Sequence, residues 1–148
     1  IGDARVYLLR DDMLSQVTRD HSRVQILIET GELTPEQARR DPRRNVVTRA
    51  LGGGIADSAV PDLYSVPVSA GDRLLICSDG LSDELDDEAI ATVLAAGYTA
   101  QRTAELLVAA SLEGGGHDNT TAVVVDSAET PAPAPAVVPG DASTQEAL

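Results

Sequence analysis

Short segments with β-strand character outnumber the strands that one alternating strand–helix–strand pattern would give, and this excess constrains the fold more than any other feature of the sequence. The run Leu74-Leu75-Ile76-Cys77 is continuously apolar, which predicts a strand that is buried on both faces. The segment 121–125 has the same character and is expected to be a second buried strand. Further segments that are rich in Val, Leu and Tyr, and are therefore strand-like, are 1–9, 14–18 (a hairpin with 1–9) and 63–68. The segment 46–51 is expected to be extended as well.

The expected helices come in pairs. Thr34-Pro35-Glu36-Gln37 is a capping box with Pro at the first helical position, and Asp86 is a good N-cap for a later helix. Such capping signals predict helices between Ser22 and Gly31, from Thr34 to about Arg40, over 87–96, and from Thr99 to the Gly114–Gly116 run. Paired helices together with an excess of strands predict an α+β fold built in layers.

The composition of the sequence changes from Ser127 onward. Pro131-Ala132-Pro133-Ala134-Pro135 favours extended conformers without apolar periodicity. We therefore predict a folded part over 1–126 and a disordered Pro/Ala-rich tail or linker over 127–148. Ile1 is not a methionine and strand character begins at once, so we expect this sequence to be a fragment that starts inside a folded domain.

The charge balance excludes several classes of function. Asp and Glu number 24 against 11 basic residues, all of them Arg, which gives a net charge of −13. Nucleic-acid binders and polybasic membrane-surface proteins need clustered cations, so neither class fits. No apolar run approaches the ~20 residues that a membrane-spanning helix needs. The single cysteine, Cys77, excludes an internal disulfide, and we expect a reducing, cytoplasmic location.

Three aspartates lie at the boundaries of predicted strands. Asp79 follows the run 74–77, and Asp118 precedes the segment 121–125. If those two strands pair antiparallel, both carboxylates project from one edge of the sheet, and Asp3 at the start of the first strand could reach the same edge. Hard cations such as Mg²⁺ and Mn²⁺ prefer carboxylate oxygens and water. Asp-Gly and Asp-Asn are also ordinary turn dipeptides, so the spacing alone leaves metal binding and turn formation both open.

Other polar candidates carry weaker signals. His117, next to Asp118, is either an accessory group of such a site or an exposed loop residue. His21 is expected to help start its helix. Cys77 lies in a buried strand, which favours an inert core thiol over a nucleophile.

Five motifs occur in a fixed order along the folded part. They are Gly2-Asp3-Ala4-Arg5-Val6-Tyr7-Leu8, Thr18-Arg19-Asp20-His21-Ser22, Thr48-Arg49-Ala50-Leu51-Gly52, Gly71-Asp72-Arg73-Leu74-Leu75-Ile76-Cys77-Ser78-Asp79-Gly80-Leu81 and Gly116-His117-Asp118-Asn119-Thr120-Thr121. Together they resemble the C-terminal half of the protein phosphatase 2C family, the metal-dependent (PPM-type) Ser/Thr protein phosphatases, and most of all its bacterial members. The resemblance covers nearly all of 1–126. It implies a central β-sandwich flanked by helix pairs (α-β-β-α), of which this sequence holds the C-terminal part.

The resemblance implies an enzyme that hydrolyses phosphoserine and phosphothreonine in proteins, with a water activated by two Mn²⁺ or Mg²⁺ ions. Asp79 and Asp118 match metal ligands of the family, and Asp3 matches a ligand of the third metal found in bacterial relatives. The implied partners are phosphorylated proteins, among them Ser/Thr kinases and their substrates.

The stretch from about 21 to 54 corresponds to the variable flap of the family. Its arginines between Arg39 and Arg49 face a single acid, Asp41. We therefore expect Arg43 and Arg44 to contact an acidic phosphopeptide substrate.

Two departures from the family pattern limit these expectations. Ala4 replaces the serine of the family's Gly-Asp-Ser-Arg motif, which removes a hydroxyl but keeps the expected ligand Asp3. The family's Asp-Gly-x-Gly-Gly segment with its bridging aspartate, and the arginine that holds the substrate phosphate, do not occur in this sequence. We predict that residues 1–148 alone are inactive and poorly folded, because one sheet would lack its partner layer.

Alternative functions stay open at this point. One is a regulatory phosphatase that acts on an anti-anti-sigma partner, and another is a non-catalytic pseudophosphatase that serves as a binding module. A merely acidic scaffold is a third, which leaves the order of the motifs unexplained. Retention of Asp79 and Asp118 argues against a pseudophosphatase. Membrane tethering through a segment after residue 148 is a further alternative for location.

Overall fold

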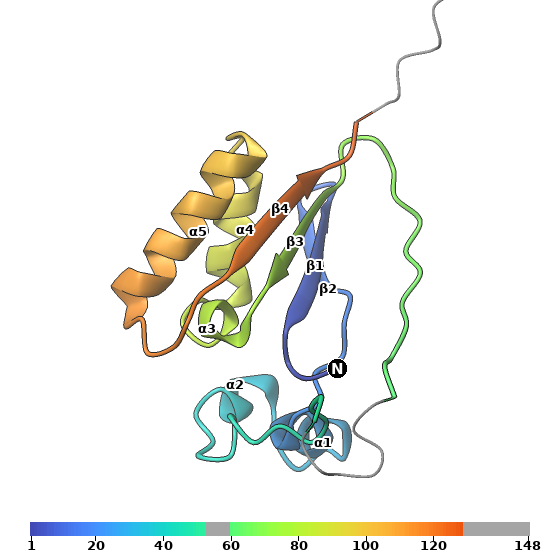
Figure 1. Cartoon of the computed structure of the whole chain (residues 1–148), viewed down its shortest axis with the longest axis vertical. Helices are drawn as coiled ribbons and strands as arrows, with labels where there is room; N and C mark the ends of the chain where they lie inside the picture. Colours follow the sequence, from blue (N-terminus) through green and yellow to red (C-terminus); the bar gives the residue numbers. More distant parts are fainter. Residues whose placement is uncertain (53–59, 129–148) are drawn as a thin grey trace, which may run out of the picture.

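The computed structural model describes residues 1–52 and 60–128, which form a sheet with helices on one face and a further pair of helices at one end of the strands (Figure 1). The described strands are β1 (Arg5–Arg10), β2 (Met13–Gln16), β3 (Arg73–Cys77) and β4 (Ala122–Asp126). They pair antiparallel in the order β2-β1-β3-β4. The described helices are α1 (Arg23–Glu29), α2 (Pro35–Ala38), α3 (Asp79–Ser82), α4 (Asp87–Ala95) and α5 (Ala100–Gly114). The predicted α+β class is confirmed, and the described residues supply one sheet of the expected sandwich.

The hairpin expected at the start of the chain is present. Asp11 and Asp12 join β1 to β2 with φ angles of 50° and 60°. Two consecutive residues in this left-handed region match the right-handed twist of the flanking strands, and Asp tolerates the region because its short side chain bonds locally.

The hydrophobic core lies between the sheet and the helices α3, α4 and α5. Tyr7 of β1 and Leu75 of β3 are direct partners in the sheet, and both are fully buried. They form one cluster with Ile90 of α4 and Leu107 of α5, which are also fully buried. Burial of each such side chain contributes about 1.5–3 kcal/mol, so this cluster is the main stabilising feature of the described fold.

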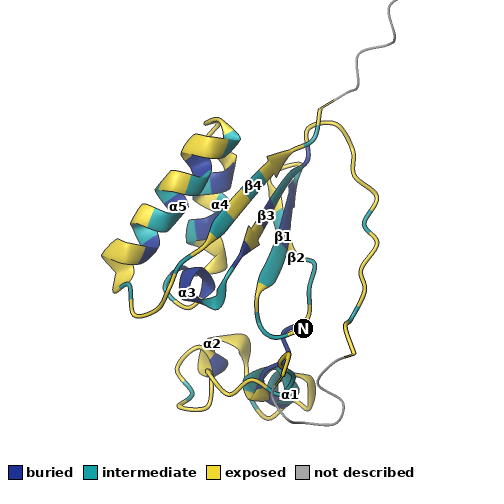
Figure 2. Cartoon of the chain, viewed as in Figure 1, coloured by how far each residue is buried: buried dark blue, intermediate teal, exposed yellow. Residues whose placement is uncertain are grey.

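The opposite face of the sheet contradicts two predictions, namely that the run 74–77 is buried on both faces and that 121–125 is a buried strand. Ile76 is 45% exposed, and Val123 beside it in β4 is 48% exposed. Side chains alternate along a strand, and the described helices α4 and α5 lie on the other face (Figure 2). Among the described residues, the apolar run therefore packs on one side only.

Helices α1 and α2 begin where their capping residues predict. The Ser22 side chain accepts a hydrogen bond from the Gln25 amide, and Thr34 and Gln37 form the full capping box. Both helices lie at the end of the sheet where β1 begins and β3 ends (Figure 1). They thereby stand next to the expected metal ligands.

The segment 63–68, predicted as a strand, has no strand partner among the described residues. Its extended backbone is held by side-chain contacts instead: the Tyr64 hydroxyl accepts from the Arg19 amide at 3.0 Å, and the Pro67 carbonyl accepts from Arg10 Nη2 at 2.8 Å. The segment 46–51, expected to be extended, makes a single bridge, between Val47 and Ser22.

Some expectations fall outside the part of the chain that the structure describes. The predicted flap, 21–54, is described to residue 52, and the predicted tail, 127–148, to residue 128. Within 1–52 and 60–128, none of the helices is both long enough and apolar enough to span a membrane.

Candidate metal centre

The pairing of β3 with β4 places the segments of Asp79 and Asp118 side by side, as predicted from the sequence. Cys77 faces Ala122 in the antiparallel register. Just beyond the strands, the Ser78 amide donates to the Thr121 carbonyl at 3.1 Å, and the Ser78 hydroxyl donates to the Asn119 carbonyl at 3.0 Å. These bonds fix the loop that carries Asp118 to the turn that carries Asp79.

Asp79 is the first residue of α3, a helix that the sequence analysis missed. Its Oδ1 accepts the amide of Gly80 at 2.8 Å, which fixes the side chain at the helix start. Thr120 donates from its hydroxyl to the Gly80 carbonyl at 3.2 Å. The Ser-Asp-Gly turn is thus the beginning of a helical turn that the Asp118 loop packs against.

Asp3 and Asp79 line the same cavity. This cavity has a volume of about 880 Å³ and lies between the end of the sheet, the start of α3 and α4, and the helices α1 and α2. The pKa of Asp3 is raised, first by burial and then by the negative charge of Asp79. Burial also raises the pKa of Asp83, and Asp79 adds to that rise. The cavity therefore gathers carboxylates whose charges repel one another.

Asp118 is placed differently from the other two aspartates. Asp118 is exposed, and its Oδ1 accepts a hydrogen bond from the Asn119 amide at 2.6 Å. It is not among the described residues that line the cavity. The structure thus brings Asp3 and Asp79 into one cavity and holds Asp118 beside the first turn of α3.

The donor chemistry of these residues fits a hard divalent cation in part. Carboxylate oxygens are the ligands that Mn²⁺ and Mg²⁺ prefer, and a cation would relieve the repulsion between Asp3 and Asp79. Among the residues that the structure describes, no three Asp, Glu, His or Cys side chains are grouped so that they could hold a metal ion. The described residues therefore offer part of a ligand set.

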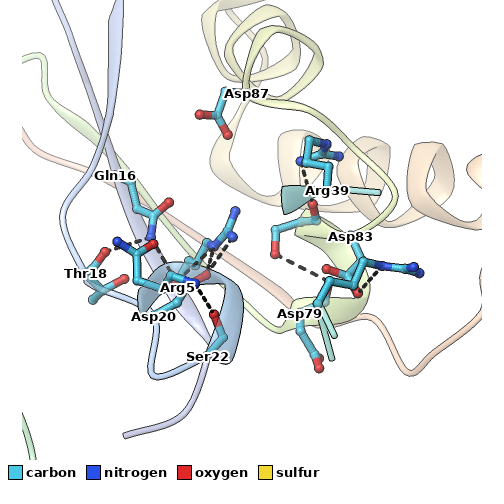
Figure 3. A network of polar contacts seen from close by, with 12 residues as sticks. Arg5, Gln16, Thr18, Asp20, Ser22, Arg39, Asp79, Asp83 and Asp87 are labelled. Carbon is cyan, nitrogen blue, oxygen red and sulfur yellow. Dashed lines mark hydrogen bonds and ion pairs between the residues drawn. The ribbon is translucent and has the colours of Figure 1, made fainter. Parts of the chain in front are cut away.

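A polar network centred on the half-buried Arg5 forms one wall of the cavity. Arg5 Nη2 lies 2.7 Å from Asp20 Oδ2 (Figure 3). Arg5 Nη1 donates to the Tyr7 hydroxyl at 2.9 Å. The Tyr7 hydroxyl in turn donates to Asp87 Oδ1 at 3.3 Å, and burial raises the pKa of Tyr7 to about 12. Arg5 and Asp20 lie inside two of the five motifs, but no role for them was predicted; the available signal was an Arg directly before the apolar run 6–9.

The two arginines predicted to bind substrate have different surroundings. Arg44 lines the cavity, and its Nε lies 3.8 Å from Asp83 Oδ2. Arg43 is held on Asp41 by two bonds of 2.8 Å and is not among the described cavity residues. Arg39, which lines the cavity as well, donates to the Ser82 carbonyl at 3.2 Å (Figure 3).

The weaker candidates are also placed by the structure. Cys77 is buried, and burial raises the pKa of its thiol to about 11, which fits the predicted inert core thiol. His117 is 78% exposed at its side chain, with Nδ1 2.8 Å from Glu84 Oε1. His21 precedes the N-cap Ser22 and is itself buried, at 3% exposure.

Comparisons with known proteins match this arrangement of fold and motifs. Serine/threonine protein phosphatase PstP of Mycobacterium tuberculosis (strain H37Rv) is 46% identical over 126 residues, which are 85% of this chain and 24% of that protein. The crystal structure of the M. tuberculosis phosphatase PstP/Ppp has a TM-score of 0.75 at 42% identity, over 87% of this chain and 53% of that one. The PstP catalytic domain in complex with two manganese ions has a TM-score of 0.72 at 39% identity, over 87% of this chain and 52% of that one.

The chain belongs to the bacterial PPM-type phosphatase family. A scan against protein-family models finds no match, so this assignment rests on the individual relatives and structures. The chain spans about a quarter of the PstP sequence and about half of the solved family structures that it matches. The resemblance predicted from the five ordered motifs is confirmed.

Proposed function

We propose that this chain supplies part of the active site of a metal-dependent protein phosphatase that hydrolyses phosphoserine and phosphothreonine in proteins. The observation that carries the proposal is the cavity that Asp3 and Asp79 share, with Arg44 on its wall. The names of its relatives support it, since those proteins are serine/threonine protein phosphatases. The pseudophosphatase and scaffold alternatives are not favoured by these comparisons.

The proposed site residues follow from their placement. Asp3 and Asp79 at the cavity, with Asp118 beside them, would hold Mn²⁺ or Mg²⁺ together with ligands from other parts of the protein and water. Such ions, when bound, neutralise phosphate charge and lower the pKa of the attacking water. In the reaction, the water oxygen bonds to phosphorus as the bond from phosphorus to the Ser or Thr oxygen breaks. A proton passes to that oxygen, which leaves as a hydroxyl group.

The cations on the cavity wall fit a phosphorylated substrate. Arg44 and Arg40 line the cavity beside the carboxylates. In our proposal they lie along the path of a phosphopeptide, whereas Arg43 is a weaker candidate because Asp41 already binds it on two sides. Ser/Thr kinases and their substrates remain the predicted partners, and the cytoplasm remains the predicted location.

A manganese titration of the intact protein tests the proposal. Asp3→Asn, Asp79→Asn and Asp118→Asn should each weaken Mn²⁺ binding, and the Asp79 and Asp118 changes should lower phosphopeptide hydrolysis by at least about tenfold. Asp12→Asn is the matched control, because it removes a carboxylate in a hairpin turn where Asn also tolerates positive φ. Wild-type Mn²⁺ affinity in all three variants would contradict the proposal.

A further inference from the structure

His21 occupies a buried junction close to the proposed metal ligands. Its backbone amide donates to the Gly2 carbonyl at 2.8 Å, and its Nδ1 accepts the Gly2 amide at 3.1 Å. The residue directly before Asp3 is therefore bonded to His21 through both of its backbone polar groups. His21 is 3% exposed, so a side chain that replaces it must offer a buried acceptor to the Gly2 amide.

The other nitrogen of the ring is held by a carboxylate. Because Nδ1 accepts the Gly2 amide, the ring proton lies on Nε2, which donates to Asp62 Oδ2 at 2.8 Å. Arg49 Nη1 donates to the other oxygen of Asp62 at 2.7 Å. These two bonds lower the pKa of Asp62 to about 2, and the bond from His21 has the larger effect. The carboxylate thus fixes both the tautomer and the orientation of the imidazole.

The same residue joins the two ends of the segment 21–49. The His21 carbonyl accepts the Thr48 amide at 2.7 Å, and the next residue along, Ser22, bridges to Val47. Helices α1 and α2, with the arginines that line the cavity, lie between these two ends. A single buried residue therefore links the start of β1 to the base of the helical pair through its backbone, and to Gly2 and Asp62 through its ring.

We propose that His21, oriented by Asp62, is a positioning residue that fixes the Gly2-Asp3 backbone at the cavity and thereby places the Asp3 carboxylate opposite Asp79. The proposal rests on the proposed function for the role of Asp3 as a metal ligand. Asp3 needs such a support because it stands before the first residue of β1, outside the ladder that holds the strand, and faces like charges. Hydrogen-bonded partners behind a ligand commonly change metal affinity by ~10–100-fold.

The test combines a metal-independent and a metal-dependent measurement on the intact protein. In His21→Ala, exchange of the Gly2 amide with solvent, followed by NMR without metal, should become about fivefold faster or more, since its buried acceptor is lost. His21→Asn keeps a carbonyl oxygen near the position of Nδ1 and should largely restore protection. Asp62→Asn should shift the ring ¹⁵N signals. Glu29→Gln, which breaks the exposed Arg19–Glu29 pair, is the control and should change neither.

The second measurement is Mn²⁺ affinity, read by electron paramagnetic resonance without substrate, in a double-mutant cycle with Asp3→Asn. His21→Ala should weaken Mn²⁺ binding about tenfold in the wild-type background and have no further effect when Asp3 is already Asn. If His21 had only a structural role, His21→Ala would weaken Mn²⁺ binding equally in both backgrounds, and that result would overturn the inference. If His21→Ala does not fold, Asp62→Asn enters the cycle in its place, with the same expected and overturning results.

The two proposals fail in different ways. Unchanged protection of the Gly2 amide in His21→Ala overturns the positioning role, whatever the metal data show. Faster exchange together with wild-type Mn²⁺ affinity in Asp3→Asn supports the positioning of the backbone and contradicts the proposed ligand role of Asp3.

Discussion

The carbonyl oxygen of Asn119 lies 2.6 Å from the position that a Cβ atom would occupy on Gly80. Cβ atoms do not approach oxygens so closely, so only glycine lets the loop that carries Asp118 pack against the first turn of α3. The Asp-Gly dipeptide at 79–80 is therefore more than a turn signal. Asp79 supplies the carboxylate, and Gly80 supplies the space that brings Asp118 beside it.

Gly80→Ala should displace the Asp118 loop. Because the clash is with backbone rather than with a movable side chain, we expect a loss of about 1–3 kcal/mol in the free energy of unfolding. Weaker Mn²⁺ binding should accompany it. Urea unfolding of the intact protein and a Mn²⁺ titration measure the two effects.

Gly114→Ala at the end of α5 is the matched control for this substitution. The nearest atom to its added Cβ is 3.4 Å away, on the Glu84 side chain, which is an ordinary contact. It should be neutral or slightly stabilising, because Ala is favoured over Gly in a helix. If both variants lost the same free energy of unfolding, the close approach at Gly80 would make no contribution to stability.

The local elements and the antiparallel edge that carries Asp79 could be predicted from the sequence, because capping and alternation act over a few residues. The helix starts at Ser22, Thr34, Asp86 and Thr99 all agree with the structure. The prediction of a strand over 63–68 was wrong. An alternating pattern indicates an extended backbone, but it does not show whether a partner strand is present.

Long-range polar contacts could not be predicted from the sequence. The bonds of Arg5 to Asp20 and of His21 to Asp62 join residues that are 15 and 41 positions apart. No local propensity encodes such pairs, which depend on the way that the strands and the segment 21–49 fold together. The same reason explains why Arg43 and Arg44, adjacent in sequence, could not be distinguished before the cavity was known.

Arg44 and Arg43 should therefore differ in their effect on substrate binding. Arg44→Gln should raise KM for a phosphopeptide several-fold more than KM for p-nitrophenyl phosphate, because the small substrate does not extend along the cavity wall. Arg43→Gln should have a smaller effect, since its guanidinium is bound to Asp41. Steady-state kinetics of the intact protein with both substrates checks this. Equal changes for the two substrates in Arg44→Gln would contradict a role in peptide binding.

Asp72 should make stability depend on acid pH. The carboxylate is buried and accepts from Arg10 Nε at 2.8 Å and from the Ser69 amide at 2.7 Å. These bonds lower the pKa of Asp72 to about 2, and the bond from Arg10 has the larger effect. A lowered folded-state pKa contributes stability that is complete above the unfolded-state pKa of ~3.9 and is lost as the pH falls toward the folded value.

Asp72→Asn should therefore lower the free energy of unfolding at neutral pH and flatten its decline between about pH 4 and pH 2. Urea unfolding at a series of pH values measures both effects, with Asp12→Asn in the exposed hairpin turn as the control. The idea fails if the pH dependence of the Asp72 variant parallels that of the wild type.

Two leucines on α5 provide a direct measure of the core. Leu107 is fully buried in the cluster with Tyr7 and Leu75, whereas Leu112, on the same helix, is 59% exposed. Leu107→Ala should destabilise the intact protein by about 2–5 kcal/mol, because it loses buried apolar contacts and leaves a cavity. Leu112→Ala should change stability by no more than about 0.5 kcal/mol. Since both changes have the same effect on helix propensity, the difference between their urea unfolding curves isolates the packing of α5 on the sheet. A difference below about 1 kcal/mol would mean that α5 contributes little to the core.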